Sequence, residues 1–189
     1  MFKRSALATM LIAATTPALA HTGQPAFSGF LAGFTHPLTG LDHTLAMVGV
    51  GLFASLLGGR ALWAVPASFV GMMLVGGMMG LASIEIPAVE FGIAASVIVL
   101  GAVVSLGRAW PVGAAMTLVG VFAIFHGYAH GAEIPTGAGA ALYSLGFTLA
   151  SAVLHGLGIV LGAAAARQTY AGRLAGAAVA VAGVVLLIG

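Results

Sequence analysis

The chain has 189 residues, of which 61% are hydrophobic and 5% are charged, and its formal net charge is +2. A soluble domain carries about 25% charged residues, so this composition is typical of an integral membrane protein. The chain has no cysteine, which excludes disulfides, thiolate zinc sites and iron–sulfur clusters. It also lacks a glycine-rich phosphate loop, so the sequence predicts no bound nucleotide, and we expect no prosthetic group.

The first twenty residues have the features of a secretory signal peptide. Lys3 and Arg4 precede a short apolar run, and residues 18–20 read Ala-Leu-Ala, an A-x-A cleavage signal. We therefore predict a signal peptide over residues 1–20 and one membrane domain over residues 21–189. An uncleaved first helix is the alternative. Cleavage leaves four arginines against four acids, so the basic isoelectric point predicts no nucleic-acid partner.

Six apolar stretches of about twenty residues follow, and each is long enough to cross a bilayer as a helix. The breaks between them carry glycine, proline and nearly every charge. We expect an all-α integral membrane bundle of about six transmembrane helices. The expected spans are Gly40–Leu57, Ala61–Ala82, Val89–Leu106, Val112–Ala129, Gly139–Ala164 and Leu174–Ile188.

The charged residues between these spans predict one orientation. Alternate loops carry arginines, namely Arg60, Arg108, Arg167 and Arg173. The positive-inside rule places these loops in the cytoplasm, so the loops that carry acids face the periplasm. An exported N-terminus followed by six crossings requires the same arrangement. We predict a multi-pass protein of a bacterial inner membrane with a periplasmic N-terminus, in contact with the lipid bilayer; the sequence is also compatible with a homo-oligomer.

Residues 36–43 (HPLTGLDH) form a motif that opens the first expected span. Pro37 disfavours helical backbone at the residue before it, so we expect a bent or re-entrant start rather than a helix at His36. Asp42 stands near a helix start, where the helix dipole favours an anion. We expect Asp42 to balance the charge of a divalent metal ion or to orient His43. The alternative is a plain helix cap.

Residues 126–133 (HGYAHGAE) form a second motif, which closes the fourth expected span. At 100° per residue, His126, His130 and Glu133 would share one face of a helix. Two imidazoles four residues apart can hold one divalent metal ion, and the carboxylate adds charge. The alternative is a pair of hydrogen-bonded histidines at a wet helix end. The two glycines of the motif would admit a neighbouring helix or an ion.

Three further residues have weaker signals. His155 lies near the middle of the fifth span, where a lone histidine is more often a hydrogen-bonded structural residue than a second ion site. Glu90, which begins the third span, is either an acid at the membrane interface or an outer charge that attracts a cation. Phe69 in the second span belongs by default to the core or to the lipid-facing surface.

Both motifs resemble the signature of the HupE/UreJ family. The matching positions read H-P-x-x-G-x-D-H over residues 36–43, followed by Met47 and Gly49, and F-H-G-x-A-H-G-x-E-x-P over residues 125–135. The signal peptide, the size and the six spans are similar too, so the resemblance covers essentially the whole chain. It implies a secondary permease, not an enzyme, that supplies nickel or cobalt for hydrogenase or urease assembly.

The family's motif residues map here onto His36, Asp42, His43, His130 and Glu133, and the resemblance points in addition to Phe69 and Glu90. With His126, which the helical spacing adds, the predicted metal ligands are His36, Asp42, His43, His126, His130 and Glu133. The resemblance and the span positions add three residues to the predicted transport path outside this ligand set, namely Glu90 at its outer entrance, Phe69 and His155.

An alternative from another functional class is a membrane-embedded zinc-dependent hydrolase that uses the same cluster. In such an enzyme Zn²⁺ would activate water, and Glu133 would be the candidate general base. A bis-histidine haem protein is disfavoured because most histidines cluster at one membrane surface beside acids. The residues alone leave open the choice between nickel and cobalt, and between a channel and coupled transport.

Overall fold

The computed structural model describes residues 29–135, 138–166 and 170–189. Within these ranges it contains helices and no strand, which confirms the predicted all-α class. The predicted signal peptide at residues 1–20 lies outside the described residues. The helices are α2 (Gly29–Thr39), α3 (Leu41–Leu57), α4 (Ala61–Leu81), α5 (Val89–Leu106), α6 (Val112–Ala132), α7 (Ala140–Ala165) and α8 (Ala171–Ile188).

The helices from α4 to α8 are each long and apolar enough to cross a membrane. Helices α2 and α3 meet the same criterion together, as a pair bent by 84°. By length and composition, the described residues therefore contain five candidate membrane spans, or six when the bent pair counts as one span. The predicted spans agree with these helices to within three residues at either end.

The prediction of non-helical backbone at His36 is wrong, because α2 includes both His36 and Pro37. Proline removes one backbone donor, and threonine hydroxyls satisfy carbonyls at the end of this helix. Thr39 Oγ1 donates to the His36 carbonyl at 2.7 Å, and Thr44 Oγ1 donates to the Pro37 carbonyl at 2.8 Å. The bent start is confirmed, but the bend is at Gly40, whose backbone is extended (φ −95°, ψ 120°).

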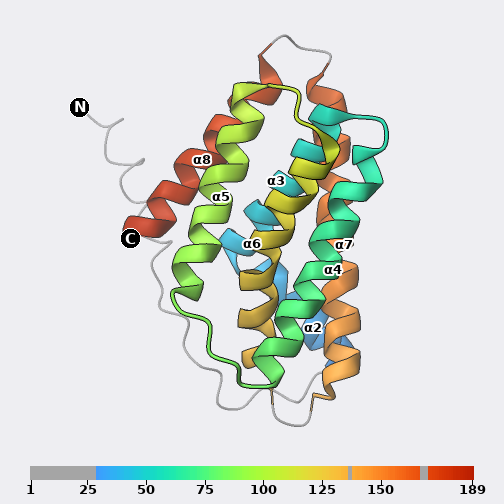
Figure 1. The fold of residues 1–189 in the computed structure, drawn as a ribbon, viewed down its shortest axis with the longest axis vertical. Helices are drawn as coiled ribbons and strands as arrows, with labels where there is room; N and C mark the ends of the chain where they lie inside the picture. The colour runs from blue at the N-terminus through green and yellow to red at the C-terminus, as the bar shows by residue number, and fades with distance from the viewer. Residues whose placement is uncertain (1–28, 136–137, 167–169) are drawn as a thin grey trace, which may run out of the picture.

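Helix α3 occupies the centre of the bundle. It packs against α4, α5 and α7, with smaller contacts to α2, α6 and α8, and Figure 1 shows it running through the middle of the molecule. Met47, Val50 and Phe53 on this helix are completely buried. Asp42 and His43, the end of the first motif, therefore lie in the first turn of a central helix, where side chains of several neighbouring helices meet.

The two ends of the bundle differ in charge (Figure 1). The lower end in the figure holds α2, the α4–α5 connection and the end of α6. It carries all four acids of the chain, Asp42, Glu85, Glu90 and Glu133. The upper end holds the connections α3–α4 and α5–α6, the end of α7 and the start of α8. It carries the described arginines Arg60, Arg108 and Arg173. We call the lower, acidic end the outer end.

Helices α4 and α6 approach each other through glycine. A Cβ added at Gly127 would overlap the carbonyl oxygen of Met73, and one added at Gly131 would overlap the carbonyl oxygen of Gly77. The two backbones are therefore in direct contact, as is common where small residues lie between membrane helices. The glycines of the second motif admit a neighbouring helix, as predicted, and that helix is α4.

We expect Gly127→Ala to lower the free energy of unfolding by about 1–3 kcal/mol, because the methyl group would force α4 and α6 apart. Unfolding of the purified protein in detergent micelles, followed by circular dichroism, measures this change. Gly113→Ala on the same helix is the matched control, since a Cβ there meets nothing within 4 Å. Equal stability of the two variants would contradict the close α4–α6 contact.

Candidate metal-binding site

Three potential metal ligands converge at the outer end of the bundle. His36 on α2, His130 near the end of α6 and Glu133 just after α6 each offer one ligand atom, and these atoms lie within 4.8 Å of one another. His36 Nε2 is 3.5 Å from Glu133 Oε2. Glu133 is exposed, whereas His130 is buried. This outer site (His36, His130 and Glu133) therefore reaches from water into the protein.

Asp42 holds the ring of His43. The Asp42 Oδ1 atom accepts a hydrogen bond from the His43 backbone N–H at 2.7 Å and lies 2.8 Å from His43 Nδ1. An ionised carboxylate can only accept, so Nδ1 carries the proton and Nε2 keeps its lone pair. His43 Nε2 is buried and has no hydrogen-bond partner within the described ranges. Among the predicted roles of Asp42, orientation of His43 is the one that the geometry supports.

The plain-cap alternative for Asp42 fits less well, because Gly40 is the N-cap residue of α3 and no side chain caps it. The absence of a side chain at Gly40 also leaves space for the carboxylate of Asp42. A Cβ there would lie 2.8 Å from Asp42 Oδ1 and 3.2 Å from His43 Nδ1. The bend and the Asp42–His43 pair therefore depend on the same glycine.

Four imidazoles lie in contact, one after another. The ring centroids of His36 and His130 are 4.7 Å apart, those of His130 and His43 are 4.4 Å apart, and those of His43 and His126 are 4.8 Å apart. We call these four residues the histidine row. Successive members come from α2, α6, α3 and α6, so the two motifs interleave instead of forming separate clusters.

His126 ends the row in the interior of the bundle. It is completely buried, and its Nε2 lies 2.8 Å from the hydroxyl of Ser96 on α5. Its other ring nitrogen, Nδ1, has no hydrogen-bond partner in the part of the chain that the structure describes. The same is true of both ring nitrogens of His130. Buried nitrogens with free lone pairs are groups that can ligate a divalent metal ion.

Two further buried residues lie beyond the row, on the side away from the outer end. The ring of Phe69 on α4 lies 5.7 Å from that of His126 and 5.2 Å from that of His155 on α7, measured between centroids. Both ring nitrogens of His155 lack a hydrogen-bond partner among the described residues. The expectation that His155 is a hydrogen-bonded structural residue is therefore not met there. The ring of Phe69 therefore contacts both the last residue of the histidine row and His155.

Glu90 is not brought to the site. It lies in the first turn of α5 at the outer end, where it is exposed. Its side chain makes no hydrogen bond or ion pair with any residue that the structure describes. Glu90 is therefore an exposed acid at the outer end of the bundle and not a ligand in the outer site.

Helix α7 supplies residues that the sequence reasoning missed. The ring of Tyr143 is 5.9 Å from that of His36, and the ring of Phe147 is 3.8 Å from that of His130. Together with Ser151 and His155, these residues recur every fourth position and are all buried. That spacing was a visible signal for one face of a helix packed against the site. Ser96 had only the weaker signal of a polar residue in an apolar span.

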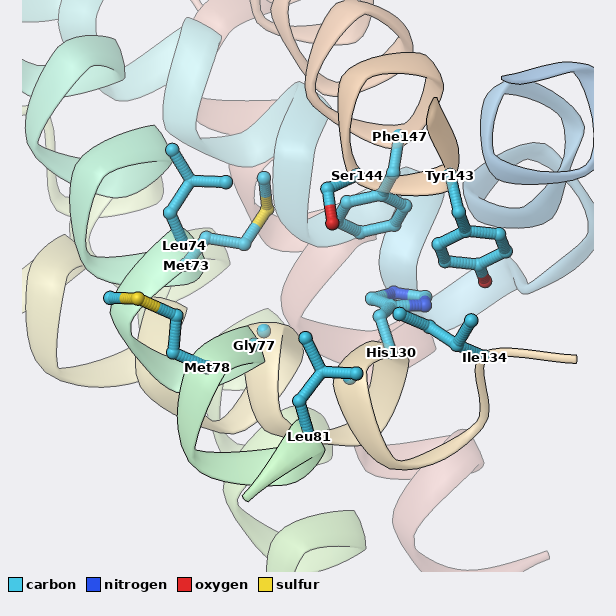
Figure 2. A pocket seen from close by; sticks show the side chains of 12 residues that line it. Met73, Leu74, Gly77, Met78, Leu81, His130, Ile134, Tyr143, Ser144 and Phe147 are labelled. Atoms are coloured by element: carbon cyan, nitrogen blue, oxygen red, sulfur yellow. The ribbon is translucent and has the colours of Figure 1, made fainter. Parts of the chain in front are cut away.

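A cavity of about 330 Å³ adjoins His130, between α4 and α7. Figure 2 shows the imidazole at the edge of this cavity, with the rings of Tyr143 and Phe147 above it. The rest of the lining is mainly apolar and includes Met73 and Met78. Such a surface offers little to stabilise a hydrated divalent cation, whereas Glu133 and His36 place polar ligand atoms within 4.8 Å of that of His130.

Comparison with known proteins extends the similarity over nearly the whole chain. A family model described as "HupE / UreJ protein" matches residues 8–186. Protein HupE of Rhizobium leguminosarum bv. viciae is 46% identical over 191 residues, which cover 99% of this chain and 100% of the relative. No solved structure matches the chain significantly. The matched range contains both histidine motifs and every residue of the outer site.

We expect Asp42→Asn to weaken divalent metal binding by about 10–100-fold, because the amide no longer fixes the proton of His43 on Nδ1. Titration calorimetry with Ni²⁺ and the purified protein in detergent measures the affinity. Asparagine caps helices as well as aspartate does, so a residue that acted only as a cap would tolerate the change. Glu85→Gln, an exposed acid at the same end, is the matched control.

Proposed function

The chain belongs to the HupE/UreJ family, and on this premise we propose that it is a secondary permease that carries nickel from the periplasm to the cytoplasm. Members of the family are membrane accessory or transport proteins linked to nickel supply for hydrogenase and urease, and they are not enzymes. That property sets aside the zinc-dependent hydrolase. The described helices are those of a multi-pass membrane protein.

The histidine row is the observation that supports transport best. It starts beside the exposed Glu133 and ends at His126, which is completely buried. A static structural site needs one closed set of ligands, whereas only His36 and His130 of this row belong to the outer site, and the row continues beyond it to His43 and His126. Nitrogen and oxygen ligands without thiolate suit Ni²⁺ or Co²⁺. We take nickel as the substrate and cobalt as the competing one.

The outer site is the proposed point of capture. A hydrated Ni²⁺ ion would exchange water for Glu133 and His36 at the exposed edge, and then for the buried His130. Each exchange replaces water with a protein ligand before the ion leaves the aqueous phase, which reduces the desolvation penalty. Glu90 contributes negative charge at the mouth and raises the local cation concentration.

Beyond the outer site, the ion would pass along the row to His43 and His126. Asp42 keeps His43 oriented and supplies negative charge close to the ion. Phe69 follows, and its ring contacts both His126 and His155. We propose that His155 receives the ion beyond Phe69, so that Phe69 is a barrier between two ligand positions. No ATP is required for this sequence of exchanges.

The orientation follows from the two charged ends. The described arginines lie opposite the acids, and the positive-inside rule assigns the arginine end to the cytoplasm. The outer site would then face the periplasm of a bacterial inner membrane. A signal peptide over residues 1–20 and a periplasmic N-terminus complete this proposal, in which the ion enters at the acidic end and leaves at the basic one.

We expect His130→Ala to reduce Ni²⁺ uptake into proteoliposomes by at least about tenfold, because His130 belongs to both the outer site and the histidine row. Uptake is measured with a trapped metal-sensitive dye, with Ni²⁺, Co²⁺ and Zn²⁺ compared side by side. The matched control is Glu85→Gln, which should retain the uptake of the unmodified protein.

Full Ni²⁺ uptake by His130→Ala would contradict the proposed path. Zinc binding without any metal flux in the unmodified protein would contradict the permease itself. Faster uptake of Co²⁺ than of Ni²⁺ would correct the substrate and leave the path standing.

His155→Leu tests the inner part of the path. Leucine is close to histidine in size but cannot ligate a metal, so we expect uptake to fall by about tenfold while Ni²⁺ affinity at the outer site changes less than twofold. Uptake assays and titration calorimetry on the same preparation separate the two effects. Unchanged uptake would show that the ion does not use His155.

A further inference from the structure

Ser96 on α5 is completely buried, and its hydroxyl makes two hydrogen bonds. One goes to the backbone carbonyl of Ile93 at 2.6 Å, and the other joins Nε2 of His126 on α6 at 2.8 Å. We propose that Ser96 is a positioning residue that fixes the tautomer of His126 and thereby presents its Nδ1 atom to the metal ion. This inference rests on the proposed permease function.

The tautomer follows from a count of protons. A serine hydroxyl has one hydrogen to donate, and a carbonyl oxygen at 2.6 Å can only be its acceptor. If the hydrogen pointed elsewhere, two oxygen lone pairs would face each other at that distance. The bond between Ser96 and His126 must therefore be donated by the ring, so the His126 proton is on Nε2. The lone pair is then on Nδ1, the nitrogen without a partner among the described residues.

This arrangement has the form of metal-ligating histidines in general, which donate their second ring N–H to a carboxylate, a carbonyl or water. His43 follows the same rule with its two ring nitrogens exchanged, because Asp42 accepts a hydrogen bond from Nδ1–H and leaves Nε2 without a partner among the described residues. Neighbouring members of the row would therefore ligate through different ring nitrogens.

A neutral hydroxyl suits the buried position of Ser96 better than a charged carboxylate would. A carboxylate orients His43 where the side chain of Asp42 is 28% exposed. Ser96 and His126 are both completely buried, and an ionised carboxylate there would carry a large desolvation penalty. A hydroxyl whose hydrogen is held by a backbone carbonyl accepts a bond as a carboxylate would, but adds no charge.

Nuclear magnetic resonance tests the tautomer directly. Long-range proton–nitrogen correlation of the metal-free, ¹⁵N-histidine-labelled full chain in micelles distinguishes the protonated from the unprotonated ring nitrogen. The His126 signals are identified by their absence in His126→Asn. We expect Nε2 protonated and Nδ1 unprotonated in the unmodified protein, and a mixture of tautomers in Ser96→Ala. A His126 proton on Nδ1 in the unmodified protein would overturn the proposal.

Transport kinetics test the consequence. We expect Ser96→Ala to raise the KM for Ni²⁺ uptake about tenfold, and Ser96→Thr, which keeps the hydroxyl, to restore most of the loss. The matched control is Ser68→Ala, which removes a serine bond to α6, from Ser68 Oγ to the Met116 carbonyl, without touching an imidazole.

The remaining outcomes separate the two proposals. Equal KM values for Ser96→Ala and Ser68→Ala would reduce Ser96 to a helix-packing residue and overturn the inference. An unmodified protein that moves no Ni²⁺ but has the expected His126 tautomer would refute the permease and leave the assignment of the proton intact.

Discussion

The site depends on one break in one helix. His36 and His43 are seven residues apart, and in a continuous helix they would be stacked on one face about 10 Å apart along its axis. The 84° bend at Gly40 instead turns α2 away from α3. His36 then lies at Glu133 and His130, while His43 enters the bundle between His130 and His126. Interleaving of the two motifs is a direct consequence of this bend.

A second constraint is the separation of charge from ligands. Carboxylates in the bilayer interior are expensive, and in this chain all four lie at the outer end. The potential metal ligands inside the bundle are instead imidazoles, which are neutral when deprotonated. A neutral imidazole presents one lone pair, and a hydrogen-bond partner decides which ring nitrogen carries it. Two members of the row, His43 and His126, have such a partner, and the partners differ in charge. The partner of His43 is the carboxylate of Asp42, near the surface, and the partner of His126 is the hydroxyl of the completely buried Ser96.

The sequence predicted the helices well because each span is a long apolar stretch between charged or glycine-rich breaks. It failed at α2, where the local rule for the residue before proline was overridden by threonine hydroxyls that satisfy the last carbonyls. The convergence of the motifs was expected from topology, since alternate helix ends share one membrane face. The order His36, His130, His43, His126 could not be predicted, because it depends on the bend angle. The partner of His126 was missed because a single serine in an apolar span has no sequence pattern that identifies its neighbour.

The confinement of every carboxylate to one end has an energetic consequence. On the proposed path, a metal ion that has passed Asp42 and His43 meets no further carboxylate, and it would carry both of its positive charges across the rest of the bilayer. Each elementary charge gains about 2.3 kcal/mol per 100 mV of inside-negative potential, and a divalent ion therefore gains about 4.6 kcal/mol. At tenfold per 1.4 kcal/mol, that corresponds to an accumulation of roughly 2,000-fold. Transport of this kind would be electrogenic, and the membrane potential would favour accumulation of the metal ion inside the cell.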